Sequence, residues 1–146
     1  MNPSTVRVVL VTPAMQRSSR EHRFEPAGPF AMDAGEWTGR TLDEVAAADP
    51  AALHNWLTDP AYAPPGGESV ETLVARAGAW LAGLEPGTHR ITAAQAFVRA
   101  AVVHALDLPP AVFWRLDARP ATATELTGRT GRWNLRLGVP DAEPAS

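Results

Sequence analysis

Residues 66–84 read GGESVETLVARAGAWLAGL and contain the clearest helix of the 146-residue chain. Ser69 is a favourable N-cap residue, because its side-chain oxygen can accept a hydrogen bond from an unpaired N–H group of the first helical turn. Apolar residues recur at helical spacing along one face, namely Val70, Leu73, Val74, Ala77, Trp80, Leu81 and Leu84. We expect this face to pack against the core.

Short apolar segments on both sides of this helix predict a sheet. Residues 6–11 (VRVVLV) form an almost continuous apolar run, which is typical of a strand buried on both faces of a parallel sheet. A Pro-Gly turn leads from the helix into a second strand at residues 89–93. Residues 95–106 predict another buried helix, followed by two strands at 122–127 and 132–137. Strands that alternate with helices indicate an α/β protein.

Capping signals predict two short helices before residue 66. Thr41 and Glu44 fit a capping box that opens a helix ending near Ala48. Asp49 followed by proline then starts a second helix, which ends near Leu57. We expect residues 1–138 to form one domain and residues 139–146 to be a disordered tail.

The composition excludes several classes of partner and site. The net charge of -3 gives no electrostatic reason to expect a nucleic acid or an acidic membrane surface as a partner. No apolar run approaches the roughly 20 residues of a membrane helix, so we expect a cytoplasmic protein. The chain has no cysteine, and its four histidines show no metal-ligand spacing. We therefore expect neither a metal nor a cofactor.

Three motifs occur in a characteristic order: GEWTGRTLDE at residues 35–44, PPGGES at 64–69 and RAAVVHAL at 99–106. Together with the strands TEL at 124–126 and RWNL at 132–135, they resemble the histidine phosphatase (phosphoglycerate-mutase-like) superfamily over roughly residues 30–138. The resemblance implies a truncated phosphoglycerate-mutase-like three-layer sandwich. Its sheet would be mostly parallel, with antiparallel strands at the C-terminus.

The catalytic groups of that family do not match this sequence. The family's first strand ends at a nucleophilic histidine, and the resemblance places Pro13 at this position. It places Ala94 at the second histidine and Ala31 at the acid/base carboxylate. Proline and alanine offer no nucleophile or proton donor, so a phospho-enzyme is not expected.

The chain is also shorter than the family pattern before residue 35. The family carries a helix and a strand with a Ser-Pro-x-x-Arg-Ala turn in a region that this chain mostly lacks. In a second alignment, Thr12-Pro13-Ala14-Met15 matches that turn instead, and the first strand is the part that is lost. Both alignments leave a sheet edge that natural proteins usually cover, and a homodimer is the simplest way to cover it.

Two classes of function fit these departures. The first is a pocket repurposed for a small organic ligand. Such a protein could act as an isomerase, cyclase or dehydratase of specialised metabolism. Asp33 and Glu36 are its candidate acid/base groups, because they are the nearest carboxylates to the lost one. Its candidate ligand-binding residues are Pro13, Gln16, Arg17, Arg20, Trp37, Ser69, Ala94 and Gln95. The alternative is a non-catalytic dimeric scaffold or a partner-binding pseudophosphatase.

An arginine series near the N-terminus is open to two interpretations. Arg17, Arg20 and Arg23 would share one side of a helix. They could hold a carboxylate or phosphate of a ligand, or they could form a solvated face that pairs with Glu21 and Glu25.

Overall fold

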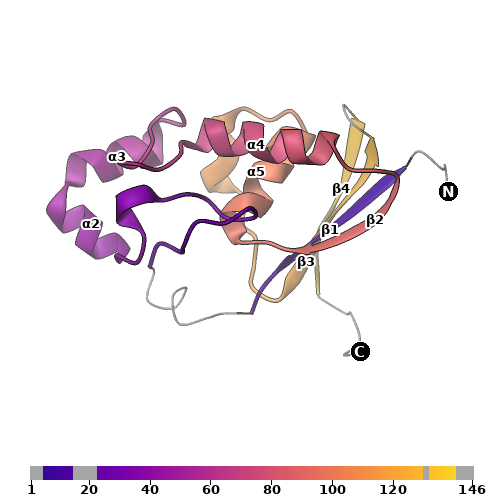
Figure 1. Ribbon diagram of the computed structural model, residues 1–146, viewed down its shortest axis with the longest axis horizontal. Helices are drawn as coiled ribbons and strands as arrows, with labels where there is room; N and C mark the ends of the chain where they lie inside the picture. Colours follow the sequence, from indigo (N-terminus) through magenta and orange to yellow (C-terminus); the bar gives the residue numbers. More distant parts are fainter. Residues whose placement is uncertain (1–4, 15–22, 130–131, 141–146) are drawn as a thin grey trace.

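The computed structural model describes residues 5–14, 23–129 and 132–140. Four strands form one sheet in the order β2-β1-β3-β4. They are β1 (Val6–Thr12), β2 (Gly87–Thr92), β3 (Thr122–Arg129) and β4 (Arg132–Pro140). β1 pairs in parallel with β2 and antiparallel with β3, and β3 pairs antiparallel with β4. Figure 1 shows this sheet at one end of the molecule.

The α/β class and the antiparallel C-terminal strands are confirmed, whereas the prediction of a mostly parallel sheet is wrong for the described strands. The parallel pair is β1 with β2, and the other two pairs are antiparallel. The physical reason is that parallel pairing needs a crossover through a helix, and the described chain makes one such crossover into this sheet. The two remaining strands form a hairpin, which adds antiparallel pairs.

The described residues form four α-helices. α4 (Val70–Ala82) packs against α5 (Gln95–Ala105), and α5 contacts β1, β3 and β4. α2 (Leu42–Ala48) and α3 (Pro50–Thr58) pack on each other at the end of the molecule away from the sheet (Figure 1). Two short 3-10 helices, η1 (Gly35–Trp37) and η2 (Pro110–Arg115), complete the described elements. The predicted helices therefore form close to their expected bounds.

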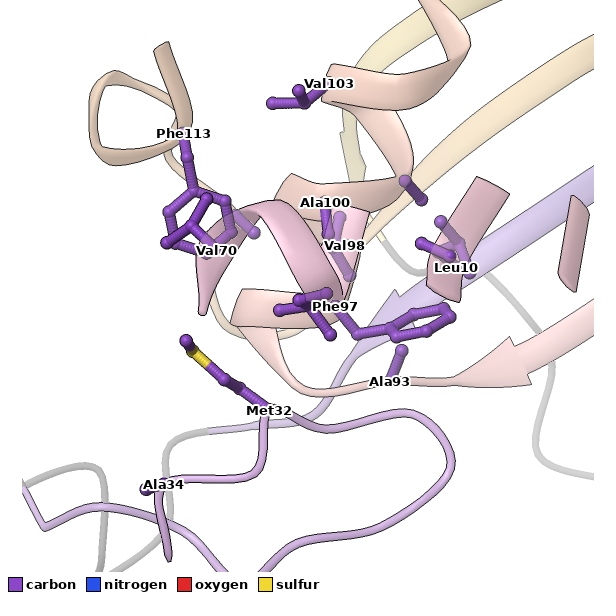
Figure 2. Close-up of a cluster of buried hydrophobic side chains, with 14 of the residues drawn as sticks. Leu10, Met32, Ala34, Val70, Ala93, Phe97, Val98, Ala100, Val103 and Phe113 are labelled. Atoms are coloured by element: carbon purple, nitrogen blue, oxygen red, sulfur yellow. The ribbon is translucent and has the colours of Figure 1, made fainter. Parts of the chain in front are cut away.

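Alternation along β1 divides the buried side chains between the two faces of the sheet. Val8 and Leu10 belong to the main core. Figure 2 shows Leu10 in this cluster with Phe97 of α5 and Phe113 of η2. The intervening side chains of β1 point to the opposite face, as the two-residue period of a strand requires. There they form a separate cluster: Val9, Val11 and Ala123.

The described helices therefore contribute to the core on one face only. All apolar helix residues in the buried clusters belong to the main core, and the second cluster consists of strand residues. Within the described residues the expected three-layer sandwich is thus present as two layers.

The C-terminal end differs slightly from the expected tail. β4 extends to Pro140, which pairs with Thr122, so residues 139–140 lie in a strand. Residues 141–146 lie outside the described residues, as do residues 15–22 of the expected Arg-rich helix. None of the described helices combines the length and apolarity needed to cross a membrane.

Candidate functional site

A cavity of about 530 Å³ lies beside the N-terminus of α5. Its walls come from the loop after residue 22, from α2 and α3, from the first turns of α5 and from η2. The lining residues are Arg23, Phe24, Glu25, Ala31, Met32, Ala34, Leu42, Trp56, Leu57, Ala94, Gln95, Ala96, Arg99 and Trp114. Most of these side chains are apolar, as is usual for a site that binds a small organic molecule.

The cavity adjoins the carboxyl end of the parallel strand pair. Val11 of β1 pairs with Thr92 of β2, so Pro13 and Ala94 follow the ends of neighbouring strands. The N–H of Ala94 donates to the carbonyl of Phe30 at 2.9 Å. This bond fastens the loop across the end of β2. The site therefore lies where open parallel sheets commonly bind ligands.

Arg76 of α4 holds that loop in place. Its guanidinium donates to the carbonyls of Pro29 at 2.8 Å and Ala31 at 2.6 Å. It also pairs with the Glu68 carboxylate at 2.7 Å, and that carboxylate accepts from the N–H of Asp33 at 2.8 Å. One guanidinium thus joins α4, the PPGGES turn and the loop that carries Ala31 and Met32 into the cavity wall.

Phe30 anchors the same loop through apolar contacts. Its ring meets Trp80 at 5.3 Å and Phe97 at 5.4 Å between centroids, both edge to face. Such pairs add to the free energy gained from burial alone. Hydrogen bonds from Arg76 and ring contacts of Phe30 therefore both hold the loop, which gives the cavity a preformed wall.

Arg99 and Gln95 supply polar groups from one face of α5. They are four residues apart, so they lie on successive turns, and both line the cavity. The Nε of Arg99 donates to the carbonyl of Leu116 at 2.8 Å, and its guanidinium lies over the Phe113 ring. Burial lowers the pKa of Arg99 below its ordinary value, and the nearby Asp117 carboxylate opposes this effect. An arginine with a lowered pKa still carries its charge at neutral pH.

Trp56 connects the cavity to an aromatic cluster. Its ring contacts Trp114 at 4.5 Å, Phe24 at 5.4 Å and Trp37 at 5.7 Å. Trp56 is only 7% exposed, yet its indole Nε1 has no hydrogen-bond partner within the described part of the chain. A buried donor without a partner costs about 1–3 kcal/mol. The unpaired N–H of Trp56 is therefore an unusual feature of the packing behind the cavity wall.

Some of the ligand-binding residues predicted from sequence reach the cavity. Ala94 and Gln95 line it, whereas Pro13 and Ser69 do not. Ser69 is the N-cap of α4. Trp37 is buried behind Trp56 and supports the wall without lining it. Three further candidates lie outside the described residues: Gln16, Arg17 and Arg20.

The structure does not bring the two candidate acid/base carboxylates to the cavity. Asp33 accepts a hydrogen bond from the N–H of Gly35 at 2.9 Å and shapes the turn before η1. Glu36 is exposed, and its N–H donates to the carbonyl of Pro65. Glu25 is the carboxylate among the described lining residues.

Several lining residues carried no functional signal in the sequence. Arg99 is the exception, because it begins the RAAVVHAL motif and lies four residues after Gln95. This spacing is the signal that predicts a shared helix face for the two side chains. Trp56 and Trp114 are 58 residues apart and meet only through the packing of α3 on η2. Only the folded chain identifies such a pair.

Comparisons with known proteins agree with this architecture. The family model of the histidine phosphatase superfamily (branch 1) matches residues 31–139. Since the match spans more than half of the chain, the protein belongs to the histidine phosphatase superfamily. No curated protein sequence matches the chain.

Solved structures of phosphatases are similar in fold. A mycobacterial glucosyl-3-phosphoglycerate phosphatase in complex with VO3 has a TM-score of 0.72 and 20% identity, covering 94% of this chain and 99% of that one. Its complex with inorganic phosphate has a TM-score of 0.62 and 27% identity, covering 77% and 61%. The alpha-ribazole phosphatase from Shigella flexneri has a TM-score of 0.75 and 12% identity, covering 96% and 99%. These similarities establish the phosphoglycerate-mutase-like fold.

Proposed function

We propose that this member of the histidine phosphatase superfamily binds a small organic molecule in its cavity and does not hydrolyse phosphate esters. The observation that carries the proposal is that Ala31 and Ala94 line the cavity. The sequence resemblance places the family's acid/base carboxylate and second histidine at these positions. Methyl groups thus face the space in which the family's polar catalytic groups would act.

The end of β1 supports the same proposal. Pro13 follows this strand, at the position that the resemblance assigns to the nucleophilic histidine. None of the described lining residues is a histidine. Nucleophilic phosphoryl transfer needs a side chain with a free electron pair at this point, and a pyrrolidine ring cannot supply it.

An acid–base reaction of the isomerase, cyclase or dehydratase type would rely on Glu25. This carboxylate lines the cavity, whereas Asp33 and Glu36 do not. A general acid or base must come within hydrogen-bond reach of the proton that it transfers. Glu25 therefore replaces the two carboxylates that the sequence favoured for this role.

A steady-state assay with p-nitrophenyl phosphate tests the loss of phosphatase chemistry. We expect the pure protein to hydrolyse the ester at the rate of heat-denatured protein, because none of the described lining residues is a histidine. An active phosphatase of the same superfamily is the positive control. Saturable hydrolysis that falls in Gln95→Ala and Arg99→Met variants would contradict the proposal.

A second copy of the chain is a further part of the proposal. β2 lies at the edge of the sheet, and its exposed side chains include Thr88 and Thr92. Free strand edges are usually covered, and a symmetric dimer covers two at once. Native mass spectrometry tests this directly: a dimer is expected, and a monomer at micromolar concentration would count against it.

A further inference from the structure

We infer that the ligand of the cavity is an amphipathic organic anion, with a flat apolar body and a single carboxylate or sulfonate group. This inference rests on the proposed function, because it names the class of molecule that the repurposed cavity binds. Three features of the described lining lead to it: an aromatic wall, a half-buried guanidinium and a neighbouring side-chain amide.

The apolar wall fits a flat organic body. Trp56 and Trp114 meet at 4.5 Å and present an aromatic corner to the cavity. Leu42 and Leu57 line the same space, yet they are 38% and 43% exposed. Large apolar side chains that are exposed around a cavity commonly mark a site for an apolar molecule. The volume of about 530 Å³ lies in the range of small-molecule sites.

The charges of the lining favour an anion with one negative charge. Two guanidinium groups, Arg23 and Arg99, face one carboxylate, Glu25. Arg23 donates to the carbonyl of Gly39 at 2.7 Å and lies 3.8 Å from Glu44, so its charge is already shared. Arg99 is the other cation of the lining, and the nearby Asp117 carboxylate shares part of its charge. Its apolar surroundings strengthen an ion pair, because the local dielectric constant is lower than that of water.

Gln95 adds a hydrogen-bonding group beside this cation. The amide of Gln95 lies one turn before Arg99 on the same face of α5. An acidic oxygen group on the ligand would accept hydrogen bonds from these two side chains, whereas a hydrocarbon would not. A molecule that is apolar throughout therefore fits less well than one that ends in an acidic oxygen group.

A matched pair of fluorescent probes tests the inference on the unmodified protein. Anilinonaphthalene sulfonate has a flat aromatic body with one acidic group, and phenylnaphthylamine has the same body without it. Fluorescence titration of the folded chain should give one sulfonate probe per chain. Its affinity should be about tenfold higher than that of the uncharged probe, or more, because a charge-assisted hydrogen bond is gained.

Variants assign this preference to the cavity. Arg99→Met should reduce the affinity for the sulfonate probe about tenfold or more and leave the uncharged probe almost unchanged. Gln95→Ala removes the amide beside Arg99, and it should weaken the sulfonate probe by a smaller factor. Arg132→Met is the matched control, because it removes the same charge from an exposed position outside the cavity.

The outcomes separate this inference from the proposed function. Equal binding of both probes would overturn the anion preference. The proposed binding of a small organic molecule would still stand. Displacement of the sulfonate probe by inorganic phosphate at similar concentration would also overturn it, because the site would then select phosphate. If neither probe binds and p-nitrophenyl phosphate is hydrolysed, the proposed function fails together with the inference.

Discussion

Replacing Gly35 with alanine is expected to lower the free energy of unfolding by about 3–5 kcal/mol. Gly35 has a φ of +57°, which L-residues rarely adopt. A Cβ at this position would also overlap with the carbonyl oxygen of Pro65 and the backbone N of Gly67. These are backbone atoms, so the clash cannot be relieved by a side-chain rotation. The motifs GEWTGRTLDE and PPGGES cross at this point.

Gly66 provides the matched control for this prediction. Its φ is +72°, similar to that of Gly35, but a Cβ there meets no atom within 4 Å. Gly66→Ala should therefore cost only the conformational penalty of about 1 kcal/mol. Urea denaturation of both variants measures the difference. Equal destabilisation of the two variants would mean that the close approach of the two loops at Gly35 does not add to the cost of the Gly35→Ala change.

Replacing Arg76 with methionine is expected to lower the free energy of unfolding by about 2–4 kcal/mol. The change leaves the mostly buried carboxylate of Glu68 without its cation and the carbonyls of Pro29 and Ala31 without a donor. The loss is smaller than for a fully buried ion pair, because the Arg76 side chain is 36% exposed. Thermal or urea unfolding of the variant gives the value.

Three further variants identify the cause of that loss. Glu68→Gln removes the charge of the partner, and the double variant Arg76→Met/Glu68→Gln should be less destabilised than the sum of the single ones. Arg132→Met removes an exposed arginine and should change stability by less than about 0.5 kcal/mol. Strict additivity of the Arg76 and Glu68 variants would show that the two side chains act independently.

Local sequence signals predicted the main elements of the fold. Ser69 followed by an apolar face at helical spacing predicted α4, and the structure confirms the cap through the bond from the Thr72 N–H to the Ser69 hydroxyl. Thr41 caps α2 in the same way. Capping and periodicity act within a few residues, and for this reason a single sequence reveals them.

The candidate site was predicted only in part, because its walls depend on contacts between distant residues. Ala94 and Gln95 were found through their place after β2. The loop at Phe30 lies across the end of β2 because it packs on Trp80 and Phe97 and is bound by Arg76. No local pattern indicates these partners.

The carboxylates illustrate the same limit. Asp33 and Glu36 were favoured because they are near the lost acid residue in sequence. Asp33 instead accepts a hydrogen bond in the turn before η1, and neither carboxylate is among the described residues that line the cavity. Distance along the chain is a weak guide to the neighbours of a site that is built from separate segments.

The most direct test of the central claim is whether the chain accepts a phosphoryl group at all. The pure protein is incubated with radiolabelled acetyl phosphate, quenched in alkali and separated on a denaturing gel, with an active phosphatase of the superfamily beside it. We expect no label on the chain, because a proline follows β1 where the resemblance places the nucleophile. Alkali-stable, acid-labile label approaching one phosphoryl group per chain would contradict it.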